Sequence, residues 1–296
     1  METSIAERVG IVLPKDPVER EAEVRKFTEV TLQILADELS QGVSGSMRKL
    51  LAFWSRMPRY SSRNILLVML QKPDASAVAS YNRWKEQGRQ VRKGAKAAFI
   101  WAPNTRREQD AVTGEMAERI TGFRLVATFS DKDLEGIEEH PLPSLWQALP
   151  DDAEPIYQVV RQSIVDSGIG VEEKRLTKGV QGLSMGGKIV LKAGLDSRSR
   201  LLCICHEWAH ELAHQGNQGD QKRDKRQEET EAECACTVIC DRLGVPNPYA
   251  RDYLSSYQVT PEMVMQSLWA IGRIVRQMLE PLGKALNTPV DCSNAA

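Results

Sequence analysis

The sequence predicts an α+β protein in which a small α/β N-terminal domain is joined to a mainly helical C-terminal domain. Its 296 residues are enough for two domains of ordinary size. Residues 1–130 contain both helical and strand-like patterns, whereas residues 156–296 contain helical patterns and one short strand. Between them, residues 131–155 are rich in acids and proline, a composition typical of a linker.

The helices of the N-terminal domain are predicted from their start signals. A long amphipathic helix is expected to begin with Asp16 as its cap and Pro17 as its first residue. A second helix is expected from Ser61 or Ser62 through the apolar run NILLVML, and a third over residues 77–87.

Strand patterns and further helices complete the predicted architecture. Two apolar stretches, residues 97–103 and 122–129, are expected to form strands on either side of a polar connection. In the C-terminal domain a helix should begin near Ile156, and the alternating Lys188 to Leu191 between glycines should form a strand. Two more helices follow, and the second ends at Gly244.

Residues 206–215 read HEWAHELAHQ, a stretch with three of the chain's four histidines, each four positions from the next. His214 continues the series but is expected to support the site rather than bind the metal, because each step of four drifts around the helix. Asp196 or Ser197 is expected to cap the helix that carries these histidines, so His206 and His210 stand one turn apart on one face. Two imidazoles and a carboxylate can hold a zinc ion and leave a fourth position for water. Glu207, beside that water, can take its proton during attack on a carbonyl, as in HExxH hydrolases.

The helix QEETEAECACTVICDRLG supplies acids that can complete this metal site. They are Glu228, Glu229, Glu231 and Glu233. Glu229 and Glu233 share a face with small residues that allow close packing against the histidine helix. We therefore predict Glu229 as the third ligand and Glu233 as the carboxylate that orients a ligand histidine. Glu231 is the weaker candidate, and the metal is expected to be Zn²⁺ or another divalent transition metal.

One stretch of the N-terminal domain carries a strong positive charge. Residues 45–107 hold fourteen basic side chains and two acids, a net charge of +12, although the whole chain has a formal charge of −1. Aromatic residues are interleaved with these cations, an arrangement suited to the phosphates and unpaired bases of single-stranded nucleic acid. The predicted binding residues are Arg59, Tyr60, Arg63, Asn64, Tyr81, Trp84, Arg89, Arg92, Lys93, Lys96 and Trp101.

The cysteines and the overall apolar pattern predict the cellular setting. Five of the six cysteines fall in the two helices of the predicted metal site, where small buried apolar side chains are expected. No CxxC pair occurs, which argues against a four-cysteine zinc site. The start METSIAERVG lacks a secretion signal, and no apolar run reaches about 18 residues. We expect a cytoplasmic protein with free thiols and no membrane partner.

Two pairs of motifs resemble the family of ArdC-type antirestriction proteins. The runs YSSRNILLVMLQKPDASAVASYNRWKEQGRQVRKGAKAAFIWAP and FRLVATFSDKDLEG resemble its N-terminal domain, and HEWAHELAH with EETEAECACTVICDRLGV resembles its metallopeptidase-like C-terminal domain. The resemblance implies single-stranded DNA binding that protects incoming conjugative plasmid DNA from host restriction enzymes, joined to a zincin-like domain. By position it makes His206, His210 and Glu229 the metal ligands and Glu207 the catalytic glutamate.

Three functions fit these sequence observations. In the first, an antirestriction protein coats single-stranded DNA and carries a zinc metallopeptidase-like domain, with Glu207 as general base and the Lys188 to Leu191 strand pairing with an extended peptide. In the second, a DNA-targeted zinc metalloprotease cleaves a host or plasmid regulator. In the third, the protein only binds DNA and its metal is structural. The sequence predicts neither the peptide substrate nor the oligomeric state.

Overall fold

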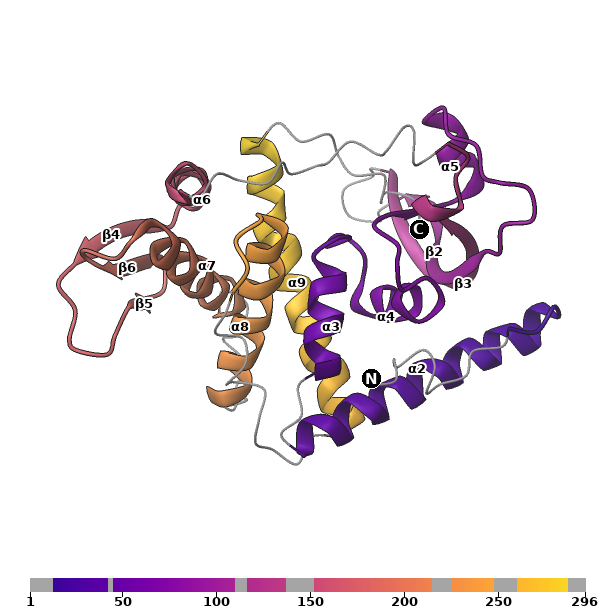
Figure 1. Cartoon of the computed structure of the whole chain (residues 1–296), viewed down its shortest axis with the longest axis horizontal. Coiled ribbons are helices and arrows are strands. Elements are labelled where there is room, and N and C mark those ends of the chain that lie inside the picture. Colours follow the sequence, from indigo (N-terminus) through magenta and orange to yellow (C-terminus); the bar gives the residue numbers. More distant parts are fainter. Residues whose placement is uncertain are drawn as a thin grey trace. The chain divides into compact units, whose positions relative to one another are not determined.

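The computed structural model describes residues 13–41, 45–109, 116–136, 152–214, 225–247 and 260–286 (Figure 1). Within these residues helices alternate with two separate three-stranded sheets, so the α+β class is confirmed. Contacts divide the chain into two compact units. Unit 1 comprises Met1–Val30, Arg63–Leu142 and Asp291–Ala296, and unit 2 comprises Thr31–Ser62 and Pro143–Val290.

Helix α2 (Pro17–Ser40) begins at the predicted residue and runs through the boundary between the units. The Asp16 carboxylate accepts hydrogen bonds from the backbone N–H groups of Val18 and Glu19, both at 2.9 Å. These bonds satisfy donors that have no partner inside the helix, and they confirm Asp16 as its cap.

Residues 31–62 group with unit 2, although the sequence assigns them to an N-terminal domain of residues 1–130. They include α3 (Gly45–Trp54), a helix that the sequence analysis did not predict. Helix α3 packs against α8 (Lys225–Arg242) of the same unit. The compact units and the predicted domains therefore have different boundaries here, and the predicted domains stay a prediction.

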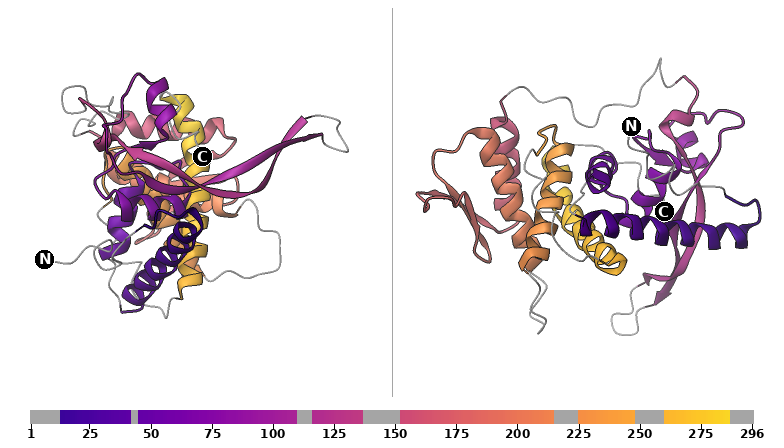
Figure 2. Two further views of the ribbon diagram at one scale, coloured as in Figure 1. Left: turned by 90° about the vertical axis from the view of Figure 1, so that its right-hand side faces the viewer. Right: turned by 60° about the horizontal axis from the view of Figure 1, so that its bottom comes forward.

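The sheet of unit 1 is antiparallel and has the order β1-β3-β2. It consists of β1 (Val78–Ala79), β2 (Ala98–Gln109) and β3 (Met116–Ser130). The two predicted strands lie within β2 and β3, and Figure 2 shows the pair as a long twisted ribbon. The pairing of β2 with β3 starts at Ala98 and Thr128, and its register shifts at Asn104 and Thr105.

The predicted helix over residues 77–87 is wrong at its start. Val78 and Ala79 form β1, paired with β3, and the helix α5 covers only Tyr81–Glu86. The Ser80 hydroxyl accepts from the Arg83 N–H at 3.3 Å and caps this helix. Residues 78 and 79 have a helical local composition, but their pairing with β3 makes them a strand. The Ser80 cap marks the residue at which the helix begins.

Helix α4 (Ser62–Gln71) closes part of the free edge of β2 with two amide side chains. Asn64 donates to the Trp101 carbonyl at 2.8 Å and accepts from the Trp101 N–H at 2.9 Å. Gln71 donates to the Phe99 carbonyl at 2.9 Å and accepts from the Phe99 N–H at 2.8 Å. The two amides thus take the place of a neighbouring strand and satisfy backbone groups that an edge strand leaves unpaired.

Part of the predicted linker is ordered and belongs to unit 1. The short 3₁₀ helix η1 (Asp131–Asp133) continues directly from β3, and the Asp131 carboxylate accepts from the backbone N–H groups of Ser76 and Ala77 at 2.9 and 3.3 Å. Residues 131–136 thus group with unit 1, whereas the sequence prediction assigns them to a linker, and the predicted linker boundaries stay a prediction. Residues 137–151 lie outside the described part of the chain.

Unit 2 places a small sheet beside a group of helices. The sheet has the order β4-β6-β5 and consists of β4 (Gly170–Lys174), β5 (Gly182–Ser184) and β6 (Lys188–Lys192). The helices are α6 (Glu154–Asp166), α7 (Ser197–His214), α8 and α9 (Pro261–Ala285). Helix α7 contacts β5 and β6 on one side and α8 on another (Figure 1).

The predicted strand of the C-terminal domain, β6, lies in the middle of its sheet. It pairs with β4 in parallel and with β5 in antiparallel fashion. The prediction that this strand pairs with a peptide is therefore wrong, because both of its edges are occupied. Neither β4, β5 nor α9 was predicted. None of the described helices combines the length and the apolar character that a membrane span requires.

The Asn64 side chain is expected to stabilise the fold. Asn64→Ala removes both hydrogen bonds to Trp101 and leaves a buried backbone N–H and C=O without these partners, so the free energy of unfolding should fall by about 2–3 kcal/mol. Urea denaturation followed by fluorescence measures this. Arg63→Ala, at the exposed neighbouring position, is the control and should change stability by less than about 0.5 kcal/mol. Equal stability of the two variants would contradict the role assigned to Asn64.

Candidate metal centre

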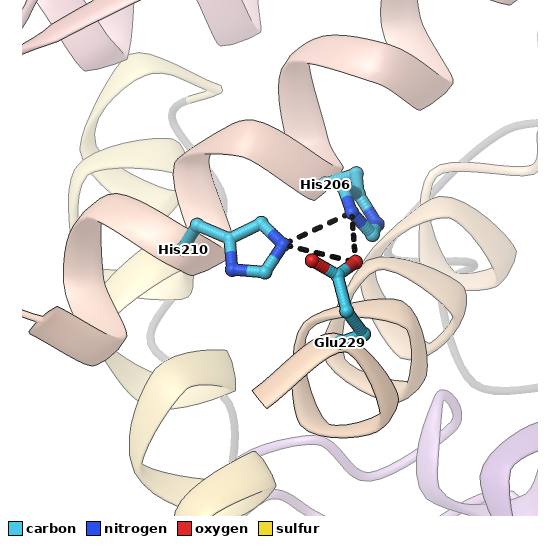
Figure 3. Close-up of side chains that lie close together, drawn as sticks. All are labelled: His206, His210 and Glu229. Atoms are coloured by element: carbon cyan, nitrogen blue, oxygen red, sulfur yellow. Dashed lines mark hydrogen bonds and ion pairs between the residues drawn. The ribbon is translucent and has the colours of Figure 1, made fainter. Parts of the chain in front are cut away.

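The three predicted metal ligands lie together in unit 2 (Figure 3). His206 and His210 project from successive turns of α7, and Glu229 faces them from α8. The two Nε2 atoms are 3.1 Å apart, and Glu229 Oε2 lies 3.4 Å from His206 Nε2 and 3.5 Å from His210 Nε2. The i, i+4 spacing on α7 thus brings both imidazoles to one point, as the helical repeat predicts.

These distances suit a tetrahedral metal ion. On an ion with bonds of ~2.1 Å, neighbouring ligand atoms lie roughly 3.4 Å apart. The three separations of 3.1, 3.4 and 3.5 Å match that value. The donor set of two imidazoles and one carboxylate also suits zinc and other divalent transition metals. The residues present therefore fit a metal ion at this point.

Glu233 contacts His206 through the ring nitrogen that does not face Glu229 and His210. Its Oε2 lies 3.0 Å from His206 Nδ1, the ring nitrogen that faces away from Glu229. Its Oε1 accepts a hydrogen bond of 2.6 Å from the Asn247 side-chain amide. A carboxylate that accepts from Nδ1–H fixes the imidazole tautomer with Nε2 free to bind a metal. Glu233 thus lies where its predicted role requires, and Asn247 is a further member of the network that sequence reasoning missed.

The charges of the site favour a cation between the ligands. Burial opposes a proton on His206, but Glu229 and Glu233 outweigh burial and raise the pKa of His206 to about 10. The hydrogen bond to His206 is the largest cause that lowers the pKa of Glu229. A positive charge at this point is therefore stabilised by the acids around it. A metal ion that replaces the proton is stabilised by the same acidic side chains.

Glu207 is half-buried beside the cluster, where α7 meets β5. Burial is the largest cause that raises the pKa of Glu207, and Glu229 and Glu211 add to the effect, while His206 opposes it. The backbone of Ser184 on β5 opposes this rise and favours the charged form of the Glu207 carboxylate. Glu207 is therefore placed to exchange protons next to the metal ligands rather than to act as one of them.

Strand β5 approaches α7 so closely that only glycine fits at position 182. A Cβ atom there would lie 2.6 Å from Cys203 Sγ and 2.7 Å from Glu207 Cγ. Strand β5 is also an edge strand, paired with β6 on one side and with no described strand on the other. The open strand beside Glu207 is thus β5, and not the Lys188 to Leu191 strand of the sequence prediction.

Other predicted residues take different places. Glu231 is buried with 2% exposure and accepts from the Gln227 side chain at 3.0 Å, outside the ligand group. This agrees with its ranking below Glu229. The five cysteines of α7 and α8 are free and buried. The sequence also offers Tyr249, Tyr253 and Tyr257 as candidates for oxyanion support, and these residues lie outside the described part of the chain.

The predicted nucleic-acid residues divide into an exposed and a buried group. Arg63, Tyr81, Arg92, Lys93 and Lys96 are exposed, and Arg59 and Arg89 are partly exposed. Tyr60, Asn64, Trp84 and Trp101 are buried, with 5%, 5%, 0% and 6% exposure.

Buried rings cannot stack on bases, and the buried Asn64 amide is bound to the Trp101 backbone, so the prediction is wrong for the second group. Trp84 belongs to a core with Ala79, Val91 and Leu134, and its indole N–H donates to the Phe129 carbonyl at 2.9 Å. The Arg25 guanidinium covers the Trp101 ring at 4.8 Å. Of the predicted aromatic residues, only Tyr81 keeps an exposed ring, at 44%. Interleaved aromatics and cations are compatible with either a core or a binding surface, and sequence alone does not separate them.

Comparison with known proteins finds a family model that matches part of the chain. A family model described as the N-terminal domain of anti-restriction factor ArdC matches residues 26–129. This confirms the ArdC resemblance predicted for that stretch. An uncharacterised protein of Bacillus anthracis is 24% identical over 72% of this chain and 44% of its own length. The chain thus spans less than half of that relative.

Solved structures resemble the fold. The metal-free crystal structure of the antirestriction ArdC protein from plasmid R388 has a TM-score of 0.54 and 16% identity, over 87% of this chain and 98% of that one. The Mn(II)-bound crystal structure of the R388 ArdC protein has a TM-score of 0.46 and 16% identity, over 75% and 89% of the two chains. At this identity the likeness to the metal-free structure concerns the fold alone.

Glu233→Ala is expected to weaken metal binding without removing a ligand. Loss of the carboxylate frees the His206 ring to rotate and to change tautomer, so the affinity for Zn²⁺ should fall by about 10- to 100-fold. Competition with a chromophoric chelator measures the affinity. Glu228→Ala, on the same helix but outside the ligand group, is the control and should bind as the wild type does. Unchanged affinity of Glu233→Ala would show that His206 is oriented by other contacts.

Proposed function

We propose that this chain, whose residues 26–129 form an ArdC-family N-terminal domain, is an antirestriction protein with a metallopeptidase-like centre in unit 2. In this proposal the N-terminal part binds single-stranded DNA and protects incoming conjugative plasmid DNA from host restriction enzymes. The observation that carries the hydrolase part is the convergence of His206, His210 and Glu229 beside the half-buried Glu207.

His206, His210 and Glu229 would hold a zinc ion or another divalent transition metal in this proposal. Such an ion, when bound, lowers the pKa of a water molecule and polarises a carbonyl. Glu233 keeps the His206 ring in the tautomer that binds the metal. Glu207 takes up a proton and later returns it to the leaving amine, a task suited to a carboxylate whose pKa is raised.

An extended peptide is the substrate class that the open strand favours. Among the described residues, no strand pairs with the outer edge of β5 beside Glu207, and the exposed apolar side chains of Leu183 and Met185 flank this edge, at 43% and 63% exposure. A peptide that adds to this edge makes main-chain hydrogen bonds and places its carbonyl groups near the ligand cluster. Alternate side chains of such a peptide meet the surface formed by Leu183 and Met185.

The number of ligands favours a catalytic over a structural metal. Structural zinc sites use four protein ligands, whereas catalytic sites use three and leave one position for water. In the described part of the chain the ligand group contains His206, His210 and Glu229 only. A protease that is brought to DNA and cleaves a regulator would use the same centre, and it differs from the main proposal in whether protection in cells needs Glu207.

The DNA-binding part of the proposal depends on exposed cations of unit 1. Arg92, Lys93 and Lys96 follow α5, and the first residue of α5, Tyr81, has an exposed ring. The backbone N–H groups and positive side chains of such a stretch can bind the phosphates of a DNA strand. One exposed aromatic ring is enough to stack on a base. Sequence preference is expected to be slight, because stacking and charge do not distinguish bases.

Glu207→Ala is expected to keep the metal and to abolish hydrolysis. The three ligands remain, so Zn²⁺ affinity should stay within about threefold of wild type, while cleavage of fluorescein-labelled casein should fall by at least about 100-fold. Glu262→Ala, an exposed glutamate of α9, is the matched control. Cleavage that survives in Glu207→Ala would contradict the role of Glu207. Loss of plasmid protection in cells carrying Glu207→Ala would favour the DNA-targeted protease.

Lys93→Ala with Lys96→Ala is expected to weaken binding to single-stranded DNA in a salt-dependent way. Removing two phosphate contacts should reduce the slope of log K against log salt by roughly 1.4. Fluorescence anisotropy of a labelled oligonucleotide over a salt series measures the slope. Arg175→Ala with Lys178→Ala, two exposed cations of unit 2, is the control of equal charge. Equal slopes for both double variants, or equal affinity for duplex and single strands, would contradict the proposed surface.

A further inference from the structure

Glu211 is a buried glutamate of α7 that belongs neither to the ligand cluster nor to the proposed proton transfer. It stands one turn after Glu207, and its exposure is 1%. A carboxylate buried to this degree is unfavourable unless hydrogen bonds satisfy both of its oxygens. Its partners therefore show what the residue does.

All four hydrogen bonds of Glu211 come from one turn, residues 184–187, which joins β5 to β6. Oε1 accepts from the Ser184 hydroxyl at 2.7 Å and from the Met185 and Gly186 N–H groups at 2.8 Å. Oε2 accepts from the Gly187 N–H at 2.6 Å. Four N–H and O–H donors on the two oxygens are the partners that an ionised carboxylate requires.

The backbone of this turn is shaped to surround an anion. Gly186 and Gly187 have φ values of 71° and 93°, in the left-handed region that glycine adopts without strain. With this geometry the N–H groups of Met185, Gly186 and Gly187 point to one place, as in the backbone nests that bind carboxylates and phosphates. In this protein the anion in the nest is a side chain of α7.

The turn held by Glu211 carries the edge strand that passes Glu207. Gly182 of β5 lies against the Glu207 side chain, where a Cβ atom would come within 2.7 Å of Glu207 Cγ. Glu207 and Glu211 are four residues apart and therefore lie on the same face of α7. Two successive glutamates of that face thus hold one strand, the first at its middle and the second at its end.

We propose that Glu211 is a positioning residue, which fixes β5 on α7 so that the open edge of the strand lies at a set distance from Glu207 and the His206, His210 and Glu229 cluster. The effect on an extended peptide depends on the proposed hydrolase function. The placement of β5 by Glu211 does not depend on it.

Local hydrogen exchange separates positioning from general stabilisation. In the 296-residue chain, Glu211→Gln keeps the shape of the side chain but replaces one acceptor oxygen by a donor, so N–H groups of the turn lose this acceptor. Amides of residues 185–187 should exchange at least about tenfold faster, while amides of α6 and α8 keep the wild-type rate. Ser184→Ala removes one of the four bonds and should give a smaller increase at the same residues.

The control is Glu280→Gln, an exposed glutamate of α9, which should leave all exchange rates unchanged. Zn²⁺ affinity of Glu211→Gln, measured by chelator competition, should stay within about threefold of wild type, because Glu211 is not a member of the described ligand group. With fluorescein-labelled casein, kcat/KM should fall by about 10- to 100-fold, through a higher KM as well as a lower kcat.

Two results would overturn the proposal. One is unchanged exchange at residues 185–187 in both Glu211→Gln and Ser184→Ala. The other is a uniform rise over all of unit 2 in both variants, which would make Glu211 a contributor to global stability only. If Glu211→Gln does not fold, Ser184→Ala decides between these results. If wild-type protein does not cleave casein, the hydrolase proposal fails, and the exchange data still decide the positioning of β5.

Discussion

The close packing of α7 against α8 is the contact on which the candidate centre depends. His206 and His210 reach Glu229 only because the two helices approach each other through small side chains. Cys205 on α7 and Cys236 on α8 are both buried, and Cys236 Sγ lies 3.5 Å from the Leu202 carbonyl. Small residues at a helix interface let the backbones come near, and larger ones would separate the imidazoles from the carboxylate. The cysteines therefore serve by their size, and burial raises the pKa of the Cys203 thiol to about 12.

The same packing concentrates negative charge, and this constrains what the centre can do. Glu207, Glu229 and Glu233 surround two imidazoles in a partly buried space, where like charges repel strongly unless a cation is present. A proton on His206 supplies one positive charge, and a divalent ion supplies more. Glu211 lies close by but is neutralised differently, by backbone N–H dipoles. The face of α7 thus carries two kinds of carboxylate, those that favour a metal and one that holds a strand.

Sequence periodicity predicted the parts of this site that depend on one helix or on two helix faces. The i, i+4 spacing brought His206 and His210 together, and the face shared by Glu229 and Glu233 gave each its place. The same spacing from Glu207 to Glu211 was also readable, but the partners of Glu211 are N–H groups of a turn whose position is set by tertiary structure. Helix α9 had readable signals that were missed, with Thr260 as its cap and Pro261 at its start.

The buried aromatic residues show the opposite limit. Trp84 and Trp101 stand among cations in the sequence, and this pattern predicts stacking surfaces. In the folded chain Trp84 fills a core and Arg25 covers the ring of Trp101. Whether a large ring faces solvent depends on residues far away in the sequence, and a local pattern does not contain that information. Short strands such as β5 escape prediction for a related reason, since three residues between polar turns show no periodicity.

The edge strand β2 of unit 1 and the edge strand β5 of unit 2 differ in how their free edges are covered. This difference favours a functional role for β5. An edge strand offers unpaired N–H and C=O groups, and proteins usually cover or blunt such edges. In unit 1, Asn64 and Gln71 close the edge of β2 at Trp101 and Phe99 with paired amide hydrogen bonds. In unit 2, β5 packs on α7 at Gly182, and Glu211 binds the turn of residues 184–187 at the end of the strand. The described structure places no strand along the outer side of β5. A strand fixed in position but left open, next to a carboxylate of raised pKa and three metal-binding side chains, is the arrangement that an extended peptide substrate requires.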